Sequence, residues 1–149
     1  MQVLKGAATS GDNDGTYLSN IRSISGGGEA ACAVSNNNNT YCWGYNGQGG
    51  LGNDTTANSS IPVRVLKGAA VGADNDGTYL TNIKSLSAGG NSSCAISNSS
   101  STYCWGYNAA GQLGNNSGAD SYIPVRVLGV GGTGFLNLTA PYNTSGTYT

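Results

Sequence analysis

The chain has no histidine, and Glu29 is the only glutamate among its 149 residues. Histidine and glutamate supply most general acids and bases, so a hydrolase built on this sequence would need a lysine or an aspartate instead. Glu29 also falls at a position that holds Asn91 in the second copy of an internal repeat, so the carboxylate is not part of the repeated unit. We therefore expect no enzymatic activity.

Charged residues are scarce, at 9% of the chain, with a net charge of −1. A nucleic-acid partner requires clustered Lys and Arg side chains, and six basic residues spread along the chain do not provide them. No stretch approaches the roughly 18 apolar residues of a membrane-spanning helix. The sequence is instead rich in Gly, Ser, Thr and Asn, which suits a secreted or cell-surface protein and close packing against copies of itself.

A long internal repeat dominates the sequence. Cys32, Cys42 and Trp43 recur 62 residues later as Cys94, Cys104 and Trp105, and Ile61–Leu66 recurs as Ile123–Leu128. A fixed period of this length indicates one supersecondary unit that packs against copies of itself. We assign residues 1–66 to a first repeat, 67–128 to a second, and 129–149 to the start of a third with a C-terminal tail.

The start of the chain resembles the interior of a repeat. Gln2–Gly6 matches Arg64–Gly68, and the first residues lack the long apolar region of a signal peptide. We therefore expect either a piece of a longer protein or a permuted repeat.

Each repeat contains four short segments with β-strand character, separated by turn-forming residues. In the second copy these segments are Ile83–Ser87, Ser93–Ser97, Thr102–Tyr107 and Tyr122–Leu128. Four such strands make one propeller-type blade. The predicted fold is all-β: two four-stranded antiparallel blades, an incomplete β-propeller completed by oligomerisation or by a further part of the chain. Simple alternation places Ile83, Ser85 and Ser87 on one face of the first strand and Lys84 and Leu86 on the other.

The cysteine positions fit a hairpin. If the turn is centred on Ser99, Cys94 and Cys104 lie directly opposite each other, and Cys32 and Cys42 have the same relation. Opposed residues in a non-hydrogen-bonded pair have Cα atoms about 4.5 Å apart, within the range for a disulfide. We predict both disulfides, which imply an oxidising compartment, extracellular or at the cell surface. Free buried thiols and a four-cysteine zinc site are the alternatives, although zinc ligands are usually more closely spaced.

These same residues resemble a known family. Cys94-Ala95-Ile96, Tyr103–Asn108, Gly111–Gly114 and Pro124-Val125 are similar to the regulator-of-chromosome-condensation repeat. The resemblance implies a β-propeller blade. The family's usual histidine is absent, and an Asp-Asn-Asp-Gly insertion precedes each unit. No motif carries over the family's nucleotide-exchange activity.

Two blades leave apolar faces and strand edges uncovered, which favours association. We predict that copies of the chain bind head to tail, as a ring or a filament, through Val3, Leu4, Ile123, Val125, Val127 and Phe135. The tail from residue 135 to 149 is a candidate donor strand for a neighbour, or else an unstructured terminus. The alternative function is a binding module for a carbohydrate or protein ligand, as part of a larger propeller.

Three further kinds of site are open from the sequence. Asp12, Asp14, Asp74 and Asp76 cluster oxygen ligands as calcium loops do, although Asp-Gly sequences also form turns, and the distal Glu of an EF-hand is absent. Calcium is the only cofactor that the sequence suggests. Tyr41, Trp43, Tyr45 and their copies suit either a blade core or stacking on sugars. Eight glycosylation sequons occur, at Asn38, Asn53, Asn58, Asn91, Asn98, Asn115, Asn137 and Asn143.

Overall fold

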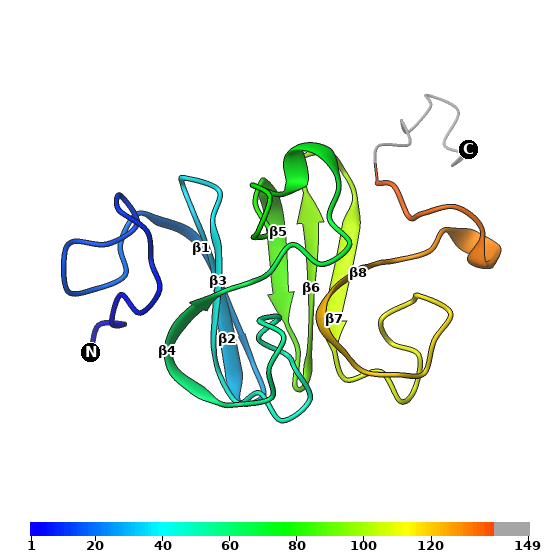
Figure 1. Cartoon of the computed structure of the whole chain (residues 1–149), viewed down its shortest axis with the longest axis horizontal. Helices are drawn as coiled ribbons and strands as arrows, with labels where there is room; N and C mark the ends of the chain where they lie inside the picture. Colours follow the sequence, from blue (N-terminus) through cyan, green and yellow to red (C-terminus); the bar gives the residue numbers. More distant parts are fainter. Residues whose placement is uncertain (139–149) are drawn as a thin grey trace, which may run out of the picture.

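The computed structural model describes residues 1–138, and these residues form two small β-sheets (Figure 1). Two single-turn 3₁₀ helices, η1 (Gly72–Asp74) and η2 (Val130–Gly132), are the only helical elements in this range. The strands are β1 (Ile21–Gly27), β2 (Ala30–Ser35), β3 (Thr40–Gly44), β4 (Ser59–Arg64), β5 (Ile83–Ala88), β6 (Ser92–Ser97), β7 (Thr102–Gly106) and β8 (Ser121–Arg126).

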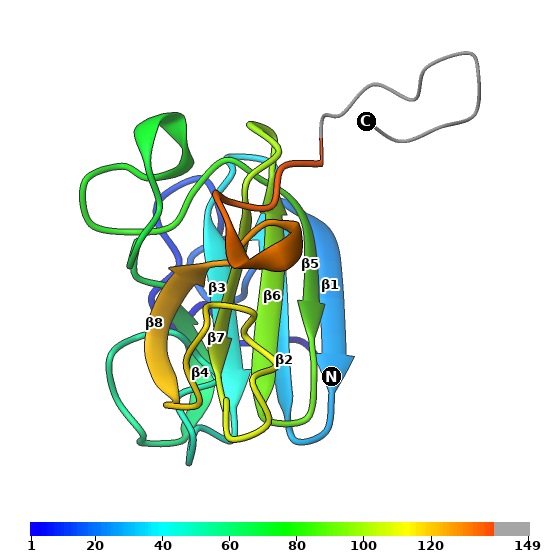
Figure 2. The same ribbon diagram turned by 90° about the vertical axis from the view of Figure 1, so that its right-hand side faces the viewer.

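Both sheets are antiparallel meanders. One has the order β1-β2-β3-β4 and the other β5-β6-β7-β8, with every neighbour antiparallel. The all-β prediction of two four-stranded blades is confirmed, and we call the sheets blade 1 and blade 2. Figure 1 shows the blades side by side, and Figure 2, turned by 90°, shows corresponding strands superimposed, so the sheets stack face to face.

The central hairpin of each blade carries a disulfide. Cys32 pairs with Cys42 in the register of β2 and β3, and Cys94 pairs with Cys104 in β6 and β7. The Cα atoms of the two pairs lie 4.0 Å and 4.1 Å apart, and both pairs form disulfides. The predicted pairings are confirmed, and the zinc and free-thiol alternatives are wrong.

One predicted face is wrong. Ile83 and Leu86 are both buried, whereas Lys84, Ser85 and Ser87 are exposed. The register of β5 against β6 shifts between Ile83 and Ser85, which marks a β-bulge. The extra residue turns the strand so that Ile83 and Leu86 share one face, and simple alternation fails at this point.

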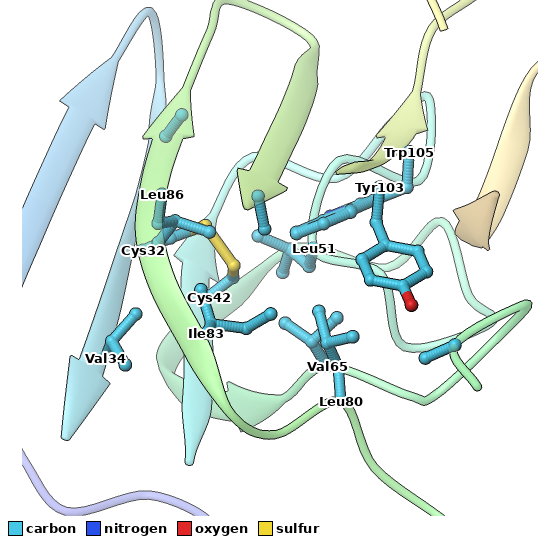
Figure 3. Packing of buried hydrophobic residues seen from close by; sticks show 13 residues of the cluster. Cys32, Val34, Cys42, Leu51, Val65, Leu80, Ile83, Leu86, Tyr103 and Trp105 are labelled. Atoms are coloured by element: carbon cyan, nitrogen blue, oxygen red, sulfur yellow. A yellow bond between two sulfur atoms is a disulfide. The ribbon is translucent and has the colours of Figure 1, made fainter. Parts of the chain in front are cut away.

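The core lies between the two blades. Blade 1 contributes Cys32, Val34, Cys42, Leu51 and Val65, all with no exposed surface. In Figure 3 the Cys32–Cys42 disulfide lies beside Ile83 and Leu86 of β5, while the Trp105 ring extends toward Leu51.

Polar contacts also join the blades at this interface. The Trp105 indole N–H donates to the Gly50 carbonyl oxygen at 2.9 Å, and the Ser93 hydroxyl donates to the same oxygen at 3.1 Å. The blade contact is therefore directional as well as apolar, because a buried indole N–H needs an acceptor.

Candidate interaction surfaces

The outer side of blade 2 repeats the side of blade 1 that forms the core. We define the C-terminal face as Cys94, Ile96, Cys104 and Val127, which lie beside Leu136. Together with neighbouring side chains these residues line a mainly apolar hollow of about 290 Å³. Their counterparts in blade 1 include Cys32, Val34, Cys42 and Val65, which blade 2 covers completely. The same pattern of side chains is therefore fully buried on one blade and, apart from Cys104, partly exposed on the other.

The outer side of blade 1 repeats the opposite half of the interface. We define the N-terminal face as Ile24, Ala31 and Trp43. Ile24 is 63% exposed, whereas Leu86, its counterpart, is 8% exposed. Trp43 is partly exposed, but its counterpart Trp105 is completely buried.

Hollows flank Trp43 on this face. One, of about 440 Å³, lies beside Gly26–Ala31, and another, of about 340 Å³, lies beside Met1–Leu4 and Ser60. The stack of two blades thus ends in two surfaces that correspond to the two sides of its own internal interface.

Each insertion that precedes a blade contains a buried aspartate that accepts a hydrogen bond from a buried tyrosine of that blade. Asp12 Oδ2 accepts hydrogen bonds from Tyr41 Oη and Asn39 Nδ2, both at 2.7 Å, and Asp12 Oδ1 accepts one from Asn37 Nδ2 at 2.8 Å. Burial by itself raises the pKa of Asp12, but the bonds from Asn39, Tyr41 and their neighbours outweigh it, so the pKa lies below its ordinary value of 3.8.

The second pair has fewer partners. Asp74 accepts from Tyr103 Oη at 2.8 Å and from Asn82 Nδ2 at 3.1 Å. Burial, followed by the hydrogen bond to Asp74, raises the pKa of Tyr103. These carboxylates hold each insertion against its own blade.

Asp14 and Asp76 form turns. Each uses its Oδ1 atom to accept two backbone amides, those of Thr16 and Tyr17 or of Thr78 and Tyr79, at 2.7–3.0 Å. The hydrogen bonds from the Tyr17 and Thr16 amides hold the pKa of Asp14 below its ordinary value. Nowhere in residues 1–138 do three or more His, Cys, Asp or Glu side chains gather as a metal site would require. This geometry fits the interpretation of these aspartates as turn formers, and calcium binding stays a prediction.

Two buried asparagines were not identified from the sequence. Asn46 and Asn108 have no exposed surface, and each amide donates to two or more acceptors in the following loop. Their Oδ1 atoms accept the Leu51 and Leu113 amides at 2.9 Å. Their recurrence, at the end of a motif that resembles the family repeat, was the signal that the sequence offered, and it does not distinguish a loop anchor from a surface residue.

The sequons lie mostly at turns and loops. Asn58, Asn91, Asn98 and Asn137 are exposed, and Asn38, Asn53 and Asn115 are partly buried. The Oδ1 atoms of Asn53 and Asn115 accept hydrogen bonds from the buried amides of Asn46 and Asn108. Asn143 lies outside the described residues, as does most of the predicted donor strand at 135–149. Glycosylation stays a prediction.

The residues predicted for self-association are distributed unevenly. Leu4 and Phe135 are about half exposed, whereas Val3, Ile123, Val125 and Val127 are partly buried. Of these, only Val127 belongs to either face as defined above. The sequence prediction missed Ile24, Trp43 and Ile96, because their exposure depends on which side of the stack each blade covers.

The aromatic stripes divide in the same way. Tyr41, Tyr103 and Trp105 are core residues, while Trp43 and Tyr45 are partly buried and Tyr107 is exposed. Among the described residues no helix is long and apolar enough to cross a membrane.

Comparison with known proteins agrees with the repeat. The family described as the regulator of chromosome condensation (RCC1) repeat matches residues 37–96 and 100–139, and a second description of this repeat matches residues 83–112. A curated relative is the ultraviolet-B receptor UVR8 of Arabidopsis thaliana, 28% identical over 112 residues. The match covers 75% of this chain and 23% of the receptor.

Solved structures give the same fold. Human WBSCR16 superimposes with a TM-score of 0.60 at 20% identity, over 83% of this chain and 33% of that one. Prp20p from Saccharomyces cerevisiae, whose structure was described together with its binding to Gsp1p and histones, has a TM-score of 0.59 at 18% identity. That match covers 87% of this chain and 33% of Prp20p, so this chain spans about a third of these structures.

Proposed function

Because the chain belongs to the regulator of chromosome condensation (RCC1) repeat family, we propose that it is a non-enzymatic interaction protein whose blades bind copies of itself. The N-terminal face of one copy meets the C-terminal face of the next. The observation that carries this proposal is the pair of outer faces, each of which matches one half of the contact between blade 1 and blade 2.

The internal interface supplies a template for the contact between copies. Trp105 donates its indole N–H to the carbonyl oxygen of Gly50, whose counterpart in blade 2 is Gln112. In the proposed contact, Trp43 of one copy donates to the Gln112 carbonyl oxygen of the next. Gly114 leaves room for the ring, because the only atoms near its added Cβ position belong to Val127.

A contact between two different faces repeats from copy to copy. It closes into a ring if the rotation per copy suits, and otherwise it continues as a filament. WBSCR16 and Prp20p are each about three times as long as the part that matches this chain. A ring of about three copies would therefore contain as much blade structure as one of those chains.

Composition and disulfides support the remaining parts of the proposal. The absence of histidine and the single glutamate argue against acid–base catalysis. Two disulfides argue for an oxidising environment, and we place the protein outside the cell or at its surface.

A second candidate function rests on Trp43. Its ring lies next to the hollow lined by Gly26–Ala31, an open and partly polar surface that suits stacking on a sugar ring or a protein side chain. As a binding module, the chain would stay monomeric and use this face for a ligand of another kind.

The native mass separates the two functions. Light scattering over a range of concentrations, with negative-stain imaging, should give rings or filaments for the wild type and a monomer for Trp43→Ala. Val71→Ala, which changes an exposed side chain outside both defined faces, is the matched control and should assemble as the wild type does. A wild-type monomer at all concentrations, together with a glycan that Trp43→Ala no longer binds, would favour the second function.

A further inference from the structure

A short backbone pairing at the joint between the two blades recurs near both ends of the described part of the chain. At the joint, the Leu80 amide donates to the Val65 carbonyl oxygen at 3.0 Å, and the Asn82 amide donates to the Asn38 carbonyl oxygen at 3.2 Å. The segment Tyr79–Asn82, which leads into blade 2, is thereby attached to blade 1. It forms part of the internal interface.

At the C-terminal end of the described residues, a segment of the chain makes the same pairing with blade 2. The Leu136 amide donates to the Val127 carbonyl oxygen at 2.9 Å, and the Leu138 amide donates to the Ser100 carbonyl oxygen at 3.2 Å. We call residues 135–138 the cap. The cap occupies on blade 2 the place that Tyr79–Asn82 occupies on blade 1.

Near the N-terminus, the segment that leads into blade 1 pairs with the first residues of the chain. The Leu18 amide donates to the Val3 carbonyl oxygen at 2.9 Å, and Leu4 forms a β-bridge with Tyr17. Tyr17–Asn20 is the counterpart of Tyr79–Asn82 and leads into blade 1. A second copy that docked as blade 2 docks on blade 1 would bring its own Tyr17–Asn20 to the position of the cap.

Two segments cannot occupy one place in a packed interface. Resting on the self-association proposed above, we infer that the cap competes with residues 17–20 of a second copy for the site beside Arg126, Val127 and Ser100. Docking is then an exchange in which the cap leaves its site. The Leu18 amide of the incoming copy moves from its own Val3 carbonyl oxygen to the Val127 carbonyl oxygen of the receiving copy. The incoming Asn20 amide then donates to the Ser100 carbonyl oxygen.

The arginine of each site shows which occupant fits better. Arg64 lies over the Tyr79 ring at 3.8 Å and also forms an ion pair with Asp76 Oδ2 at 3.0 Å. Arg126 lies over the Phe135 ring at 3.7 Å but forms no ion pair with any of residues 1–138. An incoming copy would offer Tyr17 for the ring and Asp14 for the carboxylate, whose Oδ1 is already held by the turn.

The cap itself is an incomplete occupant. Phe135 is 50% exposed, whereas its counterpart Tyr79 is partly buried, and Leu136 is partly exposed, whereas its counterpart Leu80 is fully buried. The cap nevertheless has the advantage of being tethered to its site, which gives it a high effective concentration. It therefore sets the protein concentration at which copies begin to associate, and weakening it should promote association.

The test measures the concentration of half-association by sedimentation velocity for four full-length chains. Phe135→Ala removes the ring of the cap and leaves the incoming Tyr17 intact, so this concentration should fall about fivefold, as loss of one cation–π contact implies. Asp14→Asn keeps the turn, because an amide oxygen can also accept the two backbone amides, but removes the charge, so it should raise the concentration about threefold. Val130→Ala, in η2 just before the cap and 95% exposed, is the matched control and should have no effect.

The outcomes separate this inference from the proposed function. If the wild type associates and Phe135→Ala associates equally well or less well, the exchange is wrong and self-association stands. If all four chains stay monomeric at every concentration, both are wrong. Thermal unfolding of each variant confirms that it is folded before its association is compared.

Discussion

Blade 1 and blade 2 come from repeats that are identical at 42 of 64 aligned positions, but they bury opposite sides. Trp105 lies against blade 1 with no exposed surface, whereas Trp43 is at an open face. The Cys32–Cys42 disulfide is fully buried beneath blade 2, whereas Cys94 remains partly exposed. In a stacked repeat, whether a side chain is buried therefore depends on the neighbouring unit. Side chains of a kind that is buried between the blades are more exposed at the two ends of the stack.

The largest expected effect is on the two tryptophans. Trp105→Ala removes a buried ring and its hydrogen bond to Gly50, so it should lower the free energy of unfolding by about 4 kcal/mol. Trp43→Ala should lower it by less than about 1 kcal/mol in the monomer, because this ring is only partly buried. Urea unfolding at a concentration where the chain is monomeric gives both values, and equal losses would mean that the two blades are not distinguished by their neighbours.

The disulfides should differ in their reaction with reductant. Each closes a short loop and should contribute about 2.7 kcal/mol on the chain-entropy model. Under native conditions dithiothreitol should reduce Cys94–Cys104 first, because blade 2 shields the sulfur atoms of Cys32–Cys42. Alkylation of the new thiols followed by peptide mass spectrometry identifies the order. The reverse order would contradict the burial described here.

Two adjacent glycines of β1 test the fit of the blades. A Cβ atom added to Gly27 would lie 2.1 Å from the Ala88 carbonyl oxygen of blade 2, whereas one added to Gly26 would meet nothing within 4 Å. Gly27→Ala should therefore destabilise the chain by about 2 kcal/mol through overpacking. Gly26→Ala is the matched control in the same strand and should change little. Thermal unfolding of both variants measures the difference.

A smaller effect depends on pH. The pKa of Asp12 is lower in the folded chain than in the unfolded chain, so its ionised form stabilises the fold at neutral pH. This contribution is present above the ordinary pKa of 3.8 and is lost as the pH falls through the lower folded pKa. Asp12→Asn should cost about 1.5 kcal/mol at pH 7, and the difference from the wild type should shrink below pH 4. Unfolding curves at several pH values measure it, and a constant difference would contradict the account.

Part of this architecture follows from the sequence. The central turns place Cys94 and Cys104 directly opposite each other, so the disulfides could be read from spacing alone. The face of β5 could not, because a bulge at Ile83–Ser85 depends on pairing with β6. The exposure of Trp43 and Ile24 was also missed, since their repeat counterparts, Trp105 and Leu86, are core residues.

The cap shows the same limit. Phe135 and Leu136 correspond to Tyr79 and Leu80, so the sequence predicts the start of a third repeat at this point. The sequence does not show that this segment pairs with Val127 of blade 2, and the backbone hydrogen bond from the Leu136 amide does.

Mixing two singly blocked chains tests most directly whether the outer faces fit each other. Trp43→Ala blocks the N-terminal face, and Ile96→Arg places a charge on the C-terminal face, so each variant alone should lose chain-to-chain growth. An equimolar mixture keeps one intact face of each kind, and light scattering should show a dimer with one copy of each. A mixture that stays monomeric while the wild type assembles, or a blocked chain that still forms rings or filaments alone, would contradict face-to-face docking.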